Sequence, residues 1–347
     1  MARVYVGMSG GVDSSVAAAL LVEQGHEVTG VYMKNWSQDL PGMKCPWAED
    51  LADAKRVAVA LGIDFKVYDF EAEYRDKVVQ YMIDEYSLGR TPNPDIMCNQ
   101  EVKFRLFLDT ALSDGAEQIA TGHYARIDRS GDSTSLLQAV DEAKDQTYFL
   151  YRVTSEALSK TVFPLGDYTK AEVRQMAIDR KLWTADKRES MGVCFVGQVG
   201  MRDFLSQYVQ VQPGDIIDRD TARVVGRHDG AIFYTLGQRH GLDVGGGLPY
   251  YVVGKDMPSN VVFVSRNLND GAMWRNEFAI EDTHWINQPP QDNQSLQVRT
   301  RHRAPLVDCR LEGSTLNLAR PERAVTPGQS AVIYSQGAVL GGGVVVA

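Results

Sequence analysis

One glycine-rich turn limits what this chain can fold into more than any other feature. The residues from Gly7 to Ser14 are Gly-Met-Ser-Gly-Gly-Val-Asp-Ser, and they join the apolar segment 4–7 to a helical pattern over 13–24. A second strand-like segment follows at 27–33, so the pattern predicts a parallel βαβ unit. The unpaired N–H groups at the start of such a helix attract a phosphate, and glycines let the phosphate approach the backbone. We therefore expect a phosphate-binding loop.

The sequence around the loop narrows the kind of phosphate site. A Walker loop would end in Gly-Lys-Ser or Gly-Lys-Thr, and a dinucleotide site would have an acidic residue after the second strand, which here ends in Met33-Lys34. A turn that binds nothing would not require Ser9, Asp13 and Ser14 together. Ser-Gly-Gly-Val-Asp-Ser resembles the signature of the ATP pyrophosphatases, which split ATP between its α and β phosphates and adenylylate a substrate oxygen.

The alternation of strands and helices continues beyond the loop. Helical patterns at 48–61, 74–86 and 101–112 and strand patterns at 65–69 and 118–121 predict a doubly wound, mostly parallel α/β sheet. The resemblance of the loop to the ATP pyrophosphatases implies that this sheet is of the adenine nucleotide α-hydrolase type. We place this domain at 1–150. A mostly helical connector, with an amphipathic helix over 170–182, is expected at 151–210.

The pattern of apolar and turn-forming residues changes after residue 210. Short Val- and Tyr-bearing segments, separated by Gly, Pro, Asn and Asp, predict antiparallel strands of a C-terminal β-barrel domain at 211–347. The expected strands are 231–234, 250–254, 261–265, 296–300 and 331–334.

Composition excludes several classes of protein. Hydrophobic residues make up 44% and charged residues 23%, as in ordinary globular proteins, and no apolar run approaches the roughly 18 residues of a membrane span. With no secretory signal pattern, we expect a soluble cytoplasmic protein without a membrane partner, a monomer when free. The net charge of −9 opposes uniform attraction to nucleic acid but allows a local basic surface. The four cysteines form no C-x-x-C pair, which disfavours structural disulfides and zinc.

Two cysteines lie in informative surroundings. Cys98 follows Gly-Arg-Thr-Pro-Asn-Pro-Asp, in which two prolines stiffen the presentation of Asn93 and Asp95. Asp95 is also a candidate N-cap, and Cys98 falls near the start of the same helix, where the pKa of a thiol is lowered. Cys194 lies in Gly-Val-Cys-Phe-Val-Gly. From local sequence alone, each thiol could equally be an inert, buried side chain.

Motifs along almost the whole chain resemble those of the bacterial tRNA-specific 2-thiouridylase family. Besides the loop and the two cysteine motifs, they are Thr121-Gly-His-Tyr-Ala, Lys144-Asp-Gln-Thr-Tyr-Phe-Leu, Tyr234-Thr-Leu-Gly-Gln-Arg and Leu340-Gly-Gly-Gly. One departure is Glu189-Ser-Met, where some members have Asp-Ser-Thr.

This resemblance implies a specific reaction. ATP and Mg²⁺ would activate O2 of the wobble uridine of a tRNA by adenylylation, and the Cys194 persulfide would then deliver sulfur to C2. Cys98 would be the partner nucleophile and form a disulfide with Cys194, while Asp95 would shuttle a proton. The persulfide would come from a donor protein, either a cysteine desulfurase or a sulfur-relay protein.

The resemblance also assigns binding residues. Those matched to ATP are Gly7, Met8, Ser9, Gly10, Gly11, Val12, Asp13, Ser14, Met33 and Gly122. Those matched to the target base are Asn93, Pro94 and Asp95. Those matched to tRNA contacts are His123, Lys144, Asp145, Gln146, Arg301, His302 and Gln329, and the basic run 299–303 is the kind of segment that contacts phosphates.

Three alternatives stay open from the residues alone. The same loop serves ligases that act on small molecules, which would not need the two cysteines. A non-catalytic, nucleotide-dependent RNA-binding module would also use the loop. In a third alternative, Asp95, Cys98 and Cys194 would hold an iron-sulfur cluster as the sulfur source, although such clusters usually have four thiolate ligands.

Overall fold

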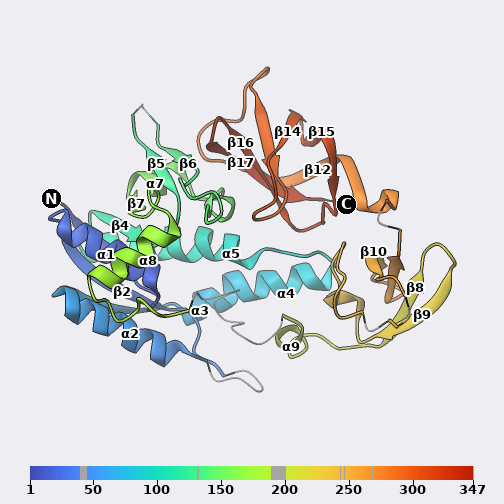
Figure 1. Ribbon diagram of the computed structural model, residues 1–347, viewed down its shortest axis with the longest axis horizontal. Helices are drawn as coiled ribbons and strands as arrows, with labels where there is room; N and C mark the ends of the chain where they lie inside the picture. Colours follow the sequence, from blue (N-terminus) through green and yellow to red (C-terminus); the bar gives the residue numbers. More distant parts are fainter. Residues whose placement is uncertain are drawn as a thin grey trace.

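The computed structural model of the protein describes residues 1–39, 45–130, 133–188, 201–242, 244–245, 247–267 and 269–346. An α/β unit at the N-terminus is followed by two separate β units, as Figure 1 shows. Helix α4 (Gln80–Ser87) and the segment after it run from the α/β unit toward both β units.

The α/β unit is built on a five-stranded sheet in which every neighbouring pair is parallel. Its strand order is β3-β2-β1-β4-β7. The strands are β1 (Arg3–Gly7), β2 (Glu27–Lys34), β3 (Asp64–Asp69), β4 (Gln118–Thr121) and β7 (Thr161–Val162). The central strands are nearly continuous runs of buried residues, as is typical of a parallel sheet covered on both faces. The predicted doubly wound fold is confirmed.

Alternate residues of β1 face two separate cores. Tyr5 packs into one core with side chains of the helices between residues 74 and 113, whereas Val4 and Val6 pack into the other with α1 (Val12–Glu23). Helix α1 is apolar on nearly all sides because α8 (Lys170–Asp179) packs against it in addition to the sheet. Figure 1 shows the two helices side by side.

A long helical run begins at Pro94, seven residues before the predicted start of its helix. It consists of α5 (Pro94–Met97), a π-helical segment η2 (Cys98–Leu106) and α6 (Phe107–Ser113). The prediction that Asp95 caps this helix was wrong. Asn93 is the N-cap, and its side-chain oxygen accepts a 3.2 Å hydrogen bond from the backbone N–H of Asp95. Proline is favoured at the first helical position, so the cap is the residue before Pro94.

Helix α2 (Trp47–Leu61) is long, and the remaining helical segments are short. The short segments are α3 (Glu71–Tyr74), the π-helical η1 (Arg75–Val79), the 3₁₀ turns η3 (Thr147–Phe149) and η5 (Gly271–Met273), α7 (Ser155–Ser159) and α9 (Met201–Leu205).

The first β unit is a four-stranded sheet with the order β10-β11-β8-β9. Its strands are β8 (Gly214–Asp218), β9 (Arg223–His228), β10 (Tyr251–Asp256) and β11 (Val261–Ser265). The strand predicted at 231–234 was wrong, because Ala231–Phe233 forms a 3₁₀ turn, η4. The backbone N–H of Ala231 is bonded to the Asn260 side chain rather than to a strand, and Ala231 itself is buried in the core of the sheet.

The second β unit is a closed six-stranded antiparallel barrel. Its order is β12-β15-β14-β13-β16-β17, and pairing between β12 and β17 closes it. The strands are β12 (Trp274–Trp285), β13 (Leu296–Arg299), β14 (Val307–Glu312), β15 (Thr315–Arg323), β16 (Ser330–Ser335) and β17 (Ala338–Val345). The predicted C-terminal barrel is therefore present, and the range 211–347 also contains the four-stranded sheet.

A hairpin from the N-terminal part of the chain joins the barrel. Strands β5 (Arg126–Asp128) and β6 (Ser135–Leu137) pair with each other, and β6 pairs with β17. The chain segment between β4 and β7 of the α/β unit thus contributes two strands to the sheet of the barrel, which ties the two units together.

The Gly-Gly-Gly run of β17 lies where the barrel closes. A Cβ atom on Gly341 would overlap the carbonyl oxygen of His284 on β12, and one on Gly342 would overlap the carbonyl oxygen of Ala331 on β16. Strands β12, β16 and β17 can approach this closely because glycine has no side chain.

We predict that Gly342→Ala lowers the free energy of unfolding by about 2 kcal/mol or more, because the added methyl group forces β16 and β17 apart. Gly271→Ala is the matched control, since its Cβ would meet no atom within 4 Å. Denaturant unfolding measures both changes. Equal stability of the two variants would contradict this account of barrel closure.

Candidate functional site

The loop between β1 and α1 is shaped by close backbone packing. Gly10 has φ +73°, and a Cβ atom there would overlap the carbonyl oxygen of Asp50 on α2. Gly11 is the N-cap of α1 and offers no side chain to the helix. The first N–H groups of α1 therefore face the loop, which is the arrangement that binds phosphates.

The structure brings the other predicted nucleotide residues to this loop. A Cβ atom on Gly122, at the end of β4, would lie 2.7 Å from the backbone nitrogen of Ser14. One on Gly7 would lie 2.9 Å from Cε of Met33. Inside the loop, the Ser9 N–H donates to Oγ of Ser14 at 3.2 Å. Residues from β1, β2 and β4 thus meet at the carboxyl edge of the sheet, where doubly wound folds bind their ligands.

Sequence reasoning missed a lysine at this loop. The ammonium group of Lys170 lies 2.7 Å and 2.8 Å from the two carboxylate oxygens of Asp13. The hydroxyl of Tyr124 donates to the same carboxylate at 2.9 Å. The capping box of Thr169 and Glu172 marks the start of α8 in the sequence. Nothing in the sequence, however, pairs Lys170 with Asp13, which lies 157 positions away.

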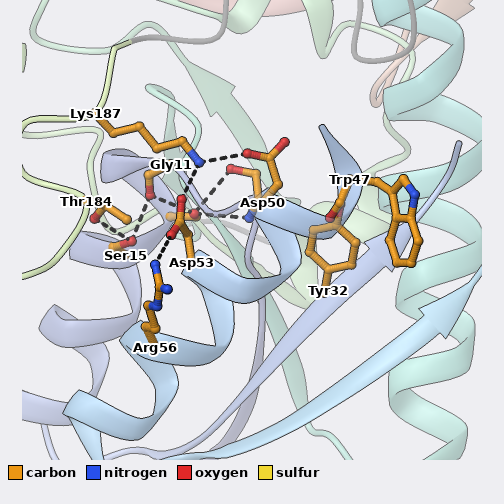
Figure 2. Close-up of polar contacts among 11 residues, drawn as sticks. Gly11, Ser15, Tyr32, Trp47, Asp50, Asp53, Arg56, Thr184 and Lys187 are labelled. Carbon is orange, nitrogen blue, oxygen red and sulfur yellow. Dashed lines mark hydrogen bonds and ion pairs between the residues drawn. The ribbon is translucent and has the colours of Figure 1, made fainter. Parts of the chain in front are cut away.

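A second lysine network supports the loop from the side of α2, as Figure 2 shows. Nζ of Lys187 lies 2.7 Å from a carboxylate oxygen of Asp50 and 2.7 Å from one of Asp53. Burial alone would lower the pKa of Lys187, but the hydrogen bonds to the two aspartates raise it above its ordinary value. Thr184 donates to Ser15, whose hydroxyl donates to the carbonyl of Gly11 at 2.8 Å. The segment 184–187 is thereby tied to both sides of the loop.

Cys98 lies in the second turn of the helical run, deeper than predicted. It is buried, with 2% of its surface exposed, and its backbone N–H is bonded within the helix. The helix dipole acts mainly in the first turn, so the predicted effect of the helix start on this thiol is reduced. Cys194 lies outside the described residues, as does the departure at 189–191.

Asp95 lies in the first turn of the same helical run and is half-buried. Burial raises the pKa of its carboxyl group, and the nearby charge of Lys103 opposes that rise. An aspartate with a raised pKa is suited to holding and releasing a proton.

The segment before Asn93 is where the three structural units meet. The Thr91 N–H donates to the carbonyl of Pro327 at 2.9 Å, and the Gln329 amide donates to the carbonyl of Thr91 at 2.7 Å. The Thr91 hydroxyl lies 3.3 Å from that of Thr235 in the four-stranded unit. Gln329, a predicted tRNA contact, therefore holds the segment before Asn93 against the barrel.

The predicted contacts Asp145 and Gln146 are engaged inside the protein. The Asp145 side chain is fully buried and pairs with Arg299 of the barrel at 3.1 Å. Gln146 accepts from the Tyr124 N–H through its side chain at 2.9 Å. These residues anchor the turn 144–149, on which Lys144 is partly exposed.

This turn connects the barrel to the cysteine helix. The ring of His302 stacks on Phe149 with centroids 4.4 Å apart, and the Asn99 amide donates to the Phe149 carbonyl at 2.9 Å. Arg301 donates to the carbonyl of Ala324 at 2.7 Å. Arg301 and His302 are thereby brought to the same face as the residue after Cys98.

His123 lies in an aromatic cluster on the other side of that helix. Its ring contacts Phe104 and Phe163 at centroid distances of 5.6 Å and 6.0 Å, and its Nδ1 lies 2.6 Å from the Thr121 hydroxyl. Burial, assisted by the charge of Lys103, holds the pKa of His123 well below its ordinary value. His123 is therefore a neutral ring at physiological pH.

Within the described residues, no group of three or more His, Cys, Asp or Glu side chains is arranged to hold a metal ion. In the same part of the chain, no helix combines the length and apolar character needed to cross a membrane.

We predict that His302 makes stability depend on pH. Burial, together with Arg303 and Arg299, lowers the pKa of His302 to about 4. The unfolded chain therefore binds a proton at higher pH than the folded chain, and stability falls as the pH drops from about 6.5 to about 4. Denaturant unfolding at pH 7 and pH 5 should show a smaller loss for His302→Gln than for the unmodified protein.

The exposed residue His240 provides the control, and His240→Gln should keep the full loss. An equal pH dependence for His302→Gln and the unmodified protein would contradict the assignment.

Three family models match consecutive parts of the chain. A tRNA methyl transferase HUP domain matches residues 2–198, a tRNA methyl transferase PRC-barrel domain matches residues 202–266, and an aminomethyltransferase beta-barrel domain matches residues 275–345. The first match alone covers more than half of the chain. The second and third correspond to the four-stranded sheet and the closed barrel.

Two curated relatives align over nearly the whole chain. The tRNA-specific 2-thiouridylase MnmA of Bacillus subtilis (strain 168) is 45% identical over 99% of this chain and 94% of its own. That of Stenotrophomonas maltophilia (strain R551-3) is 46% identical over 99% and 93%. The family models are named for methyl transfer and these relatives for thiolation. Because the relatives align along both whole chains, theirs is the more specific description.

A solved 4-thiouridine synthetase–RNA complex with bound ATP is much more distant. It is 17% identical, with a TM-score of 0.39, over 60% of this chain and 50% of that chain. Similarity at this level gives no information about activity.

Proposed function

This chain belongs to the tRNA-specific 2-thiouridylase family, and from that premise we propose that it replaces the C2 oxygen of the wobble uridine in tRNA with sulfur, using ATP. The observation that supports this most is the 45% identity to a named 2-thiouridylase over 99% of the chain. The backbone of the loop supports the proposed use of ATP, and the position of Cys98 in the helical run after Asn93 supports its proposed part in sulfur transfer.

The first step is adenylylation of the uridine. O2 attacks the α-phosphorus of ATP, the bond to the β-phosphate breaks with its electron pair on pyrophosphate, and N3 of the base loses its proton. The backbone of Gly10, Gly11 and Gly122 would form the cradle for the phosphates. Gly10 and Gly122 support this, because a Cβ atom at either position would overlap the backbone of Asp50 or of Asp13 and Ser14, so only glycine lets these segments close around the loop. Met33, which packs beside Gly7, would contact the nucleoside.

Mg²⁺ is proposed to accompany the phosphates. Mg²⁺ usually takes one or two protein carboxylates together with phosphate oxygens, and Asp13 is the carboxylate of the loop. The ion would neutralise phosphate charge.

The second step transfers sulfur. The terminal sulfur of a Cys194 persulfide loses its proton and attacks C2, and AMP leaves with the former O2. The Cys98 thiolate then attacks the Cys194 sulfur, which releases 2-thiouridine and leaves a disulfide that a reductant must reopen. Asp95, whose pKa is raised by burial, would take up the N3 proton. An iron-sulfur cluster on Asp95, Cys98 and Cys194 is a less favoured sulfur source, because such clusters usually have four thiolate ligands.

The tRNA is proposed to lie across the junction of the three units. Lys144 and the Arg301-His302 pair would contact its backbone, while Asn93 and Pro94 would flank the flipped base. Asp145, Gln146 and Gln329 would position these segments through the contacts described above. His123, a neutral ring next to Thr121, would lie between the base and the nucleotide.

Other parts of the proposal follow from the reaction. Each cycle consumes one persulfide, so a donor protein, either a cysteine desulfurase or a sulfur-relay protein, must dock near Cys194. We propose a monomer acting in the cytoplasm, with a catalytic domain at 1–150, a connector at 151–210 and a tRNA-contacting domain at 211–347.

The test is mass spectrometry of tRNA after incubation with the protein, ATP and a persulfide donor. We expect 2-thiouridine from the unmodified protein and none from Cys98→Ser or Cys194→Ser. Both variants should still release pyrophosphate when tRNA is present, because adenylylation precedes sulfur transfer. Cys309→Ser is the matched control, since Cys309 is a buried thiol of the barrel and should be dispensable.

Absence of 2-thiouridine from the unmodified protein would overturn the proposal. Full turnover by the double variant of Cys98 and Cys194 would instead favour a small-molecule ligase, and failure to split ATP would favour an RNA-binding module. Stoichiometric iron and sulfide after anaerobic purification would show that an iron-sulfur cluster, rather than a persulfide, is the sulfur source.

A further inference from the structure

Helices α1 and α8 are joined by ion pairs at both ends of their interface. At one end Lys170 contacts both carboxylate oxygens of Asp13, and at the other Arg180 contacts both carboxylate oxygens of Glu23 at 2.7 Å. Each pair spans 157 residues of sequence. If both ion pairs served only to hold the helices together, we would expect them to lie in similar surroundings.

The two ends differ in what surrounds them. The Lys170 side chain is 12% exposed and lies at the phosphate loop, whereas Arg180 and Glu23 lie at the far end of α1, away from the loop. The backbone of Lys170 is also anchored, because its N–H donates to Asp141 at 2.9 Å. The Tyr124 ring lies under its ammonium group at 5.8 Å. The protein therefore holds one cation in a defined place at the loop.

The charge of Asp13 explains why a cation is needed there. The Asp13 side chain is 32% exposed and sits in the loop that must accept a polyphosphate. An unpaired carboxylate would repel that anion at short range, and the repulsion grows when the leaving pyrophosphate gains negative charge. A lysine that pairs with Asp13 removes the repulsion and brings a donor to the same place.

We propose that Lys170 is the residue that stabilises the leaving group during ATP cleavage. As uridine O2 bonds to the α-phosphorus, the electron pair of the broken bond stays on pyrophosphate, and the ammonium group of Lys170 contacts that pyrophosphate. The inference rests on the proposed function only in that the loop binds ATP. It adds a phosphate contact from α8, outside the loop itself.

The experiment measures binding of inorganic pyrophosphate by calorimetry and its tRNA-dependent release from ATP. We expect Lys170→Met to weaken pyrophosphate binding tenfold or more and to lower kcat for release by about 100-fold, the loss typical of removing one transition-state donor. Lys170→Arg keeps the charge and should restore most of both. Arg180→Met removes the matching ion pair and should leave binding and release within about twofold, because surface ion pairs contribute little.

Thermal unfolding shows whether the Lys170→Met protein is folded. If it is not, Lys170→Gln takes its place, because glutamine keeps a hydrogen-bond donor beside Asp13 without the charge. Lys170→Gln should show the same losses of pyrophosphate binding and release. Unchanged pyrophosphate binding in Lys170→Met or Lys170→Gln, or an equal loss in Arg180→Met, would overturn the proposal. If pyrophosphate binding depends on Lys170 and the unmodified protein forms no 2-thiouridine, the tRNA function fails and the role of Lys170 stands.

Discussion

The close approach of three backbone segments around the loop after β1 is the constraint on which the rest of the site depends. Gly10 lies against the carbonyl of Asp50, and Gly122 lies against the backbone of Ser14. No side chain fits at either point, so α2 and β4 are pressed against the start of α1. Two lysines add charged contacts around the loop: Lys187 pairs with Asp50 and Asp53 of α2, and Lys170 pairs with Asp13 of α1.

A second junction couples this site to the rest of the molecule. Thr91 contacts the barrel through Pro327 and Gln329 and the four-stranded unit through Thr235. The position of Asn93 and the residues after it is therefore set by all three units at once. Gln329, which the sequence predicts as an RNA contact, is part of this junction through its hydrogen bonds to the carbonyls of Thr91 and Pro92.

The sequence predicts much of the fold because the pattern of each strand and helix is local. The strands around the loop and the amphipathic helix at 170 follow from periodicity alone, and glycines marked the phosphate cradle. What could not be predicted depends on long-range pairing: Lys170 with Asp13, and Asn99 with the Phe149 carbonyl. Asn93 was missed as the N-cap for a local reason, because Asp and Asn are both good caps and only Pro94 decides between them.

The hairpin of β5 and β6 gives the barrel an unusual order of assembly. Its strands precede β17 by about 200 residues in the chain, yet β17 is their partner on the barrel side. During synthesis, the edge of β6 therefore has no barrel partner until nearly the last residues have left the ribosome. Pairing of β6 with β17 can therefore form only when the chain is nearly complete, so a nascent or C-terminally shortened chain that lacks β17 cannot make this connection between the hairpin and the barrel.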